Sequence, residues 1–420
     1  MTIVNKFAAD NLKCGILAGS KAEGVSCADD PDSDIDMMIV REQFVCCDDL
    51  HKSDFGHDKV VLEMARDSTA PGYTRLKCKS SDREKIVKSH HMVHKLEGQM
   101  FVGHLLNEDH LSSRYEKDHF DIISGPAFSF VFSLSHTYFK TNFNFPVVPI
   151  SVDSVESAIS CICTGHLQKW KERMRFNSWP GQELIEEISQ MNGHVVPVGN
   201  KGSEHYHLEW RICYTEAELK LIHSLNEVQL KLYVLLKMVA KKILKPICSE
   251  ISSYIMKNLL FWFVERSPAY RFKNENLMGL LFLSLRSLQH CIHKKRLSNY
   301  MIPDRNLFAG RFDDDTKTRM VEELHKLIYV HGLSFYLHYE GFEQLSSAVA
   351  KAKSALVQKD LKPNSIETTT LSTYTRNFLQ KAVQYADTGD VEFLATILNE
   401  LTEEQIERNI CDIQMLVCYK

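Results

Sequence analysis

The hydrophobic pattern of the chain changes at about Ser160, and this change constrains the fold more than any other feature. Before it, short apolar runs alternate with Gly, Asp and Pro, as strands do; examples are Met37–Val40, Val60–Met64, Ser129–Leu134 and Val147–Val152. After it, apolar residues recur three and four positions apart, which is typical of amphipathic helices; these stretches are Leu219–Leu244, Ile251–Val264, Leu277–His293 and Thr316–Val330. The pattern predicts an α+β protein in which a mixed-sheet lobe and a helical lobe enclose a ligand cleft.

The domain organisation follows from the same change. We expect residues 1–159 to form the sheet lobe, residues 160–345 the helical lobe, and residues 346–420 a linker with a C-terminal helical extension. The linker is placed on the Pro, Asn, Ser and Thr cluster at Lys359–Thr375. A chain of 420 residues is long enough to give both lobes a buried core.

The charge balance gives no general affinity for nucleic acid, because the net charge is only -4. Contact with a polyanion would therefore need a local basic patch. Two groups of basic residues are candidates: Lys169, Lys171, Arg173 and Arg175, and then Lys241, Lys242 and Lys245. The alternative is that they form the solvated faces of ordinary amphipathic helices.

The cysteines and apolar runs indicate a soluble, cytoplasmic protein. The twelve cysteines contain no C-x-x-C pair, which argues against a zinc ribbon and favours free thiols. Lys6, Asp10 and Lys13 interrupt the apolar character that a signal peptide needs. Runs such as Leu259–Val264 are shorter than the roughly 20 residues that cross a bilayer. We therefore expect no membrane contact.

The stretch Leu17–Val40 carries the most chemical information. Gly19 and Ser20 form a small-residue turn that would let backbone N–H groups and a hydroxyl approach a triphosphate. Asp34 and Asp36 flank Ile35 at the start of an apolar run, so on a strand their carboxylates project from one face. Two neighbouring carboxylates repel each other unless divalent cations lie between them, and Mg²⁺ prefers oxygen ligands.

A third acid, Asp153, lies in another strand-like run, VVPISVDSVESAI, where packing does not explain a carboxylate. The alternative for the D-x-D pair is an acidic loop with solvated carboxylates, which is how we interpret Asp29, Asp30 and Asp32. The Gly-Ser turn upstream and the strands that follow favour a metal site.

With these residues in place, the sequence resembles the cyclic GMP-AMP synthase and male-abnormal-21 (Mab-21) group of nucleotidyltransferases, above all the invertebrate cGAS-like receptors. The likeness runs from about Gly15 to about Phe308. The motifs that carry it are GSKAEG, DSDIDMM, SGPAFSF (Ser124–Phe130), SVDSV (Ser151–Val155), VVPVGNKGS (Val195–Ser203), LEWRICYTEAE (Leu208–Glu218), LYVLLK (Leu232–Lys237), ISSYIMK (Ile251–Lys257) and LSNYMIPDRNLF (Leu297–Phe308).

The resemblance implies a nucleotidyltransferase fold and a role for each matched site residue. Asp34, Asp36 and Asp153 would be the catalytic carboxylates that bind two Mg²⁺ or Mn²⁺ ions, beside the nucleotide-gripping turn of Gly19 and Ser20. The other nucleotide-binding residues would be Arg211 (base), Lys237 and Ser253 (phosphates) and Tyr254 (base stacking).

Each of three residues has a simpler alternative. Arg211 would pair with Glu209 at the surface, Lys237 would extend its charged end from an apolar helix, and Tyr254 would be a core aromatic.

The implied activity is ligand-triggered synthesis of a cyclic dinucleotide from ATP, GTP or both in innate immune signalling. Its product would act on a receptor of the stimulator-of-interferon-genes (STING) type. The alternatives are an inactive Mab-21-like nucleotide-binding or protein-interaction module, and a polymerase that extends RNA ends. Residues that would form a zinc thumb are absent from SLNEVQLKLY, which argues against double-stranded DNA as the trigger. The resemblance implies double-stranded RNA instead.

Two further departures from the family pattern concern structure. The family's N-terminal spine helix is expected to be short or missing, because eighteen residues precede Gly19. Its Trp-Pro pair is replaced by Cys163-Thr164.

Overall fold

The computed structural model describes residues 15–24, 35–48, 59–89, 91–105, 120–124, 127–132, 150–162, 164–175 and 177–331. They fall into two compact units. Unit 1 holds the described residues up to Met174, Pro180–Leu225 and Ser298–Asn306; unit 2 holds Arg175–Trp179, Asn226–Leu297 and the described residues from Leu307 onward. A mixed sheet and several helices confirm the α+β class. The predicted domain boundaries and cleft stay predictions, and the linker at Lys359–Thr375 lies outside the described residues.

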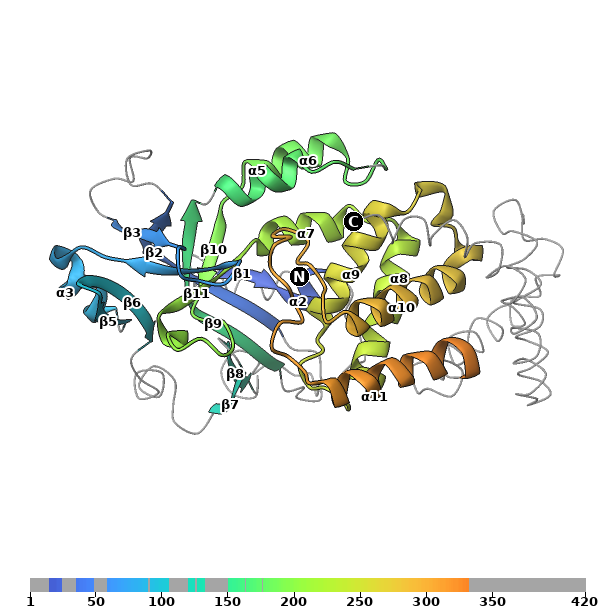
Figure 1. Ribbon diagram of the computed structural model, residues 1–420. Coiled ribbons are helices and arrows are strands. Elements are labelled where there is room, and N and C mark those ends of the chain that lie inside the picture. The colour runs from blue at the N-terminus through green and yellow to red at the C-terminus, as the bar shows by residue number, and fades with distance from the viewer. Residues whose placement is uncertain are drawn as a thin grey trace, which may run out of the picture. The chain divides into compact units, whose positions relative to one another are not determined.

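Unit 1 contains one mixed sheet, drawn in blue to green in Figure 1. Its strands are β1 (Gly15–Ala18), β2 (Ile35–Cys47), β3 (Val60–Ala65), β4 (Tyr73–Lys77), β5 (His91–Leu96), β6 (Gln99–Leu105), β7 (Phe120–Ser124), β8 (Ala127–Phe132), β9 (Ile150–Ile162), β10 (Gly193–Val196) and β11 (Glu209–Cys213).

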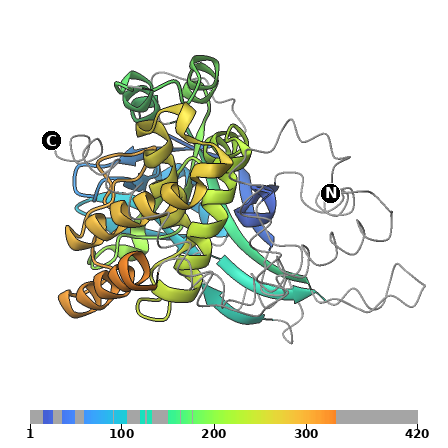
Figure 2. The ribbon, with the colours of Figure 1, turned by 90° about the vertical axis from the view of Figure 1, so that its right-hand side faces the viewer.

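The long strands β2 and β9 are parallel and form the centre of this sheet. Alongside their first halves the strand order is β1-β2-β9-β8-β7, and β8 lies beside β9 in both views (Figures 1 and 2). Alongside their second halves the pairings close a ring, β2-β3-β4-β11-β10-β9. The β5–β6 hairpin joins β4 through β6. Asp36 and Asp153 therefore lie in the open part of the sheet, next to the closed ring.

The strands form because their apolar side chains fill the core of the unit. Leu62, Leu76, Ile159 and Trp210 are fully buried. The indole N–H of Trp210 donates to the Val102 carbonyl at 2.9 Å, so burial leaves this donor satisfied. The four predicted strands are present with shifted bounds, whereas β10 and β11 lie in the region where we predicted only helices.

The helices of unit 1 border the sheet. They are α2 (Gly19–Ala22), η1 (Ser80–Asp82), α3 (Arg83–Lys88), α5 (Thr164–Glu172), α6 (Gln182–Ser189), η3 (Tyr206–Leu208) and α7 (Thr215–His223). Helix α7 packs against β1 and β10, and the His223 ring hydrogen-bonds to the Ala22 carbonyl at 3.1 Å. This contact ties α7 to the end of α2, which carries the Gly-Ser turn.

Unit 2 is helical. Its elements are α8 (Glu227–Val239), the π-helix η4 (Ala240–Leu244), α9 (Ser253–Arg266), η5 (Ala269–Arg271), η6 (Asn274–Asn276), α10 (Leu277–His293), α11 (Asp314–His325) and the π-helix η7 (Lys326–His331). Helix α10 packs against α8, α9 and α11 (Figure 1). The helix predicted over Leu219–Leu244 is wrong as one piece, because α7 ends at His223 and Asn226 caps the start of α8.

Two chemical expectations concern the described residues as a whole. Their cysteines are free thiols, as predicted; these are Cys46, Cys47, Cys78, Cys161, Cys213, Cys248 and Cys291. Within the described ranges, none of the helices combines the length and apolar character needed to cross a membrane.

Candidate functional site

The structure brings two of the three predicted carboxylates together. Asp36 on β2 is the register partner of Asp153 on β9, and the same row continues to Ala18 on β1 and Ser129 on β8. Register partners on neighbouring strands project from the same face. Both side chains are partly exposed. We name the side of the sheet that bears them the carboxylate face; Asp34 lies outside the described residues.

Gly19 packs against Asp36, and this contact joins the Gly-Ser turn to the carboxylates. Its φ of +67° is in the left-handed region. A Cβ at this position would overlap Asp36 Oδ2 and lie 2.9 Å from the Asp36 Cβ. The Asp36 carboxylate therefore occupies the space that any other residue at 19 would fill. Ser20, the next residue, is partly exposed.

An apolar surface continues the carboxylate face toward the closed ring. Met38, two residues after Asp36, packs with Ala158 and Val196, and Ile16 and Val155 lie against this cluster. Carboxylates beside apolar surface repel each other more strongly than they would in water. A divalent cation between them would relieve that repulsion.

Arg211 belongs to the same face of the sheet. It pairs in register with Val196 of the apolar cluster on one side and with Tyr73 of β4 on the other. The alternative that Arg211 pairs with Glu209 is wrong, because the described residues contain no such ion pair. The buried Glu209 carboxylate instead accepts hydrogen bonds from Asn200 N at 2.9 Å and Ser203 Oγ at 2.7 Å.

The three remaining predicted residues lie in unit 2, on the neighbouring helices α8 and α9. Lys237 Nζ is 5.5 Å from the centre of the Tyr233 ring. Ser253 is exposed at the start of α9. Tyr254 is only partly buried, and Lys257 Nζ lies 5.2 Å from its ring centre. Tyr254 is therefore not a fully buried core aromatic. Nucleotide binding by all three residues stays a prediction.

The basic residues of the first group make ion pairs and hydrogen bonds with other residues of the protein. Lys171 pairs with Glu186 at 2.5 Å, and Lys169 Nζ is 3.9 Å from Asp304. Arg173 Nη1 donates to the Tyr300 carbonyl at 3.0 Å, and its guanidinium lies over the Tyr300 ring. The Arg175 side chain is almost fully covered and pairs with the similarly covered Glu265 carboxylate at 3.2 Å. Arg173 and Arg175 therefore form neither a solvated face nor a track for phosphates.

The donor chemistry of the site suits a hard cation. Asp36 and Asp153 supply carboxylate oxygens, which Mg²⁺ and Mn²⁺ prefer. Over the described part of the chain, no cluster of three or more His, Cys, Asp and Glu side chains is placed to hold a metal ion. The pair therefore fits a divalent cation and needs further oxygen ligands, for which Asp34 is the predicted source.

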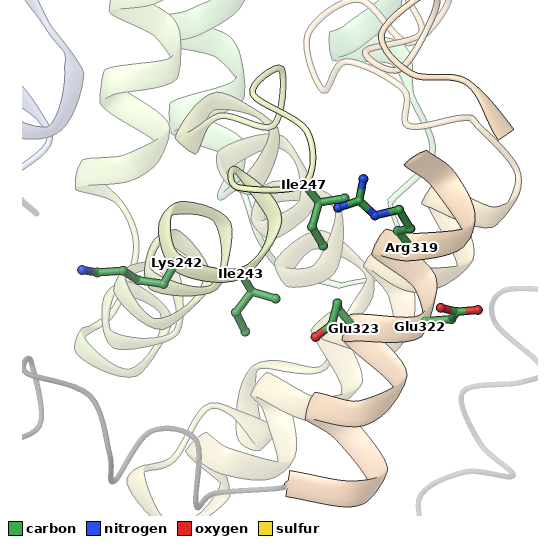
Figure 3. Close-up of a pocket in the computed structure, with 6 residues that line it drawn as sticks. All are labelled: Lys242, Ile243, Ile247, Arg319, Glu322 and Glu323. Atoms are coloured by element: carbon green, nitrogen blue, oxygen red, sulfur yellow. The ribbon is translucent and has the colours of Figure 1, made fainter. Parts of the chain in front are cut away.

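Unit 2 also has a surface hollow of about 440 Å³. Lys242, Ile243 and Ile247 line one side, and Arg319, Glu322 and Glu323 of α11 line the other (Figure 3). None of these is a predicted site residue. Two cations and two carboxylates balance the charge of the lining, so its charge favours neither an anion nor a cation.

Residues 222–336 match the model of the Mab-21 protein HhH/H2TH-like domain, which defines the class of this part of the chain. This match agrees with the resemblance to the Mab-21 group that the motifs predicted. The invertebrate type stays a prediction.

Two curated relatives are similar to part of the chain. Transmembrane protein 102 from Bos taurus is 27% identical over 146 residues, which is 34% of this chain and 27% of that protein. The same-named protein from Mus musculus is 26% identical over 145 residues, again 34% of this chain and 27% of its own length. The chain thus spans about a quarter of these relatives.

Proposed function

We propose that this protein is a nucleotidyltransferase of the cGAS-like kind, which joins nucleoside triphosphates into a cyclic dinucleotide. One observation carries the proposal: Asp36 and Asp153 are register partners on parallel strands, with Gly19 packed against the Asp36 carboxylate. The match of residues 222–336 to the Mab-21 protein HhH/H2TH-like domain supports it. A chain without this chemistry has no evident reason to keep two mutually repelling carboxylates on one face.

Each residue would have a distinct task. Asp36 and Asp153, with Asp34, would hold two divalent ions, whose charge lowers the pKa of an attacking ribose hydroxyl and offsets the charge of the departing pyrophosphate. Gly19 lets the Asp36 carboxylate lie against the backbone of the turn, and the Ser20 hydroxyl would donate to phosphate oxygens.

The remaining residues would bind the rest of the nucleotide. Arg211, on the carboxylate face, would contact a base. Lys237 and Ser253 would bind phosphates, and Tyr254 would stack on a base. The substrates would be ATP and GTP. Activation by double-stranded RNA, action in the cytoplasm and a STING-type receptor for the product complete the proposal.

The test uses the full chain with radiolabelled ATP and GTP, Mg²⁺ or Mn²⁺, and either double-stranded RNA, double-stranded DNA or no nucleic acid. We expect a cyclic product whose yield rises most with RNA. Asp36→Asn combined with Asp153→Asn should lower the rate at least 100-fold, or roughly 2.7 kcal/mol of transition-state stabilisation. Asp67→Asn, at an exposed position of the same unit, is the matched control.

The outcomes separate the alternatives. Full synthesis by a folded double variant would overturn the metal assignment. Nucleotide binding without any joined product would indicate the inactive module, and an extended RNA strand would indicate the polymerase. Equal stimulation by DNA and RNA would remove the RNA preference.

A further inference from the structure

Two histidines from distant parts of unit 1 lie ring against ring beside the β5–β6 hairpin. The centres of the His94 and His207 rings are 4.9 Å apart, with 64° between the ring planes. His94 is on β5, and His207 is in the short helix η3, which packs against β6. With Zn–N bonds of about 2.1 Å in a tetrahedral arrangement, the ring centres of two ligating histidines lie roughly 5 Å apart. The spacing of the pair therefore suits one shared metal ion.

A buried nitrogen atom of His94 lacks a partner. His94 is partly buried, and its Nε2 forms no hydrogen bond with any residue that the structure describes. Buried polar atoms nearly always have a partner, so an orphaned ring nitrogen needs an explanation. In the neutral ring, the nitrogen that carries no hydrogen can bind a metal.

Gly103 of β6 allows the two segments to meet. A Cβ at this position would lie 3.3 Å from His94 Cδ2 and 3.3 Å from the His207 carbonyl oxygen. Both contacts are tight, so a side chain at 103 would push the His94 ring and the η3 backbone apart. The small residue therefore keeps the two histidines close.

The backbone is held on both sides of the pair. A two-residue turn with positive φ at Glu97 (+47°) and Gly98 (+78°) closes the hairpin and fixes the register of the strand that carries His94. On the other side, Ser203 Oγ donates to the buried Glu209 carboxylate at 2.7 Å and holds the loop that leads into η3. The two rings are thus positioned by elements that are themselves anchored.

We propose that His94 and His207 bind a divalent transition-metal ion such as Zn²⁺, which holds the β5–β6 hairpin against η3. Imidazole nitrogen suits Zn²⁺, whereas Mg²⁺ prefers the oxygen ligands of the carboxylate face. Partial desolvation, followed by the charges of His94 and His205, lowers the pKa of His207, which favours the neutral ring that a metal needs.

The ion would have open coordination positions. Over the ranges that the structure describes, no group of three His, Cys, Asp or Glu side chains is placed to hold a metal. Water would therefore complete the coordination of an ion bound by two histidines, and the ion would exchange with solvent past the exposed His207. The pair shares no residue with the carboxylate face, so its metal would bind whether or not the protein joins nucleotides.

The test titrates Zn²⁺ into the full chain by calorimetry, with Mg²⁺ in large excess to occupy sites made of oxygen ligands. We expect the wild type to bind an additional Zn²⁺ ion that His94→Gln and His207→Gln bind at least about tenfold more weakly, because even the loss of a second-shell partner costs about 10–100-fold. His293→Gln, at an exposed histidine of unit 2, should bind Zn²⁺ as the wild type does. Asp36→Asn combined with Asp153→Asn should also keep this Zn²⁺ site.

A further variant separates a metal ligand from a packing residue. His207→Cys supplies a thiolate, which is itself a zinc ligand, so Zn²⁺ binding should persist there while His207→Gln loses it. Zn²⁺ should raise the melting temperature of the wild type and of His207→Cys but not that of His207→Gln, because an ion stabilises only the folded chain that binds it. His207 is exposed, so its variants should fold even where His94→Gln does not.

Two results would overturn the proposal. One is equal Zn²⁺ affinity in the wild type and in a folded His207→Gln protein, which would assign the ion to other side chains. The other is a folded wild type that binds no Zn²⁺ beyond the amount bound by His207→Gln, which would leave the two rings as an edge-to-face contact.

Discussion

Gly19 links the backbone conformation of the Gly-Ser turn to the position of the Asp36 carboxylate in the candidate site. Gly19→Ala would place a Cβ onto Asp36 Oδ2 and force a left-handed φ on alanine, which alone costs about 1–2 kcal/mol. Because Asp36 must move to relieve the overlap, we expect the nucleotide-joining rate to fall at least tenfold. Rate assays and urea unfolding of the purified protein measure the two effects.

Gly24 supplies the matched control. Its φ is +72°, but a Cβ there would meet nothing within 4 Å. Gly24→Ala should therefore show the backbone cost without the loss of rate. Equal losses of rate in both variants would show that the contact between Gly19 and Asp36 has no effect on the site.

The sequence indicates candidate site residues more directly than it shows how they meet. A D-x-D pair at the start of an apolar run predicts carboxylates on one strand face, and the structure places Asp36 on β2. The pairing of Asp36 with Asp153 joins segments far apart in the chain, so only strand register reveals it.

The start of helix α8 depends on a cap that local sequence encodes. The Asn226 side chain accepts from Gln229 N at 2.9 Å, and Gln229 Oε1 accepts from Asn226 N at 2.8 Å, which forms a capping box. Asn226→Ala should lower the free energy of unfolding by about 1 kcal/mol, because two backbone N–H groups lose their acceptors or their geometry. Urea unfolding monitored by circular dichroism measures this loss.

Helix α9 offers the comparison. Its N-cap residue, Ser252, makes no side-chain capping bond. Ser252→Ala should change the free energy of unfolding by less than about 0.5 kcal/mol. A loss at Ser252 as large as that at Asn226 would show that the capping box contributes nothing specific.

The elements predicted well are those with one buried and one exposed face. Helix α10 spans the predicted range, Leu277–His293, because its buried residues recur at helical spacing. Strand β10, by contrast, is buried on both faces, so GHVV shows no alternation. Strand β11 was not predicted because its charged residues, Glu209 and Arg211, interrupt the apolar pattern. Its burial depends on strands that are far away in the sequence.

At the scale of the molecule, the closed ring of strands explains why the site can be held firmly. Strands β2 and β9 contribute their first halves to the carboxylate face and their second halves to the ring. Ring closure removes free strand edges there and fixes the register of both strands. The alignment of Asp36 with Asp153 thus depends on packing throughout unit 1.

The response of the molecule to acid should depend on His194, a residue of this ring. His194 lies on β10 between Ser160 of β9 and Cys213 of β11. It is 6% exposed, and its Nδ1 has no hydrogen-bond partner in the described structure. Burial lowers the pKa of His194 from 6.5 to about 4. The folded state therefore holds the neutral ring, whereas the unfolded chain protonates it below its ordinary pKa.

The sign of the effect follows from this difference. Above pH 6.5 both states are neutral, and the contribution of His194 to stability is fully present. As the pH falls from 6.5 to about 4, only the unfolded state gains a proton, and the free energy of unfolding should drop by roughly 2–3 kcal/mol. His194→Gln should lack this component, so its stability should fall less steeply over that range in urea unfolding. The exposed His293→Gln should follow the wild type, and a wild-type slope in His194→Gln would show that acid sensitivity arises elsewhere.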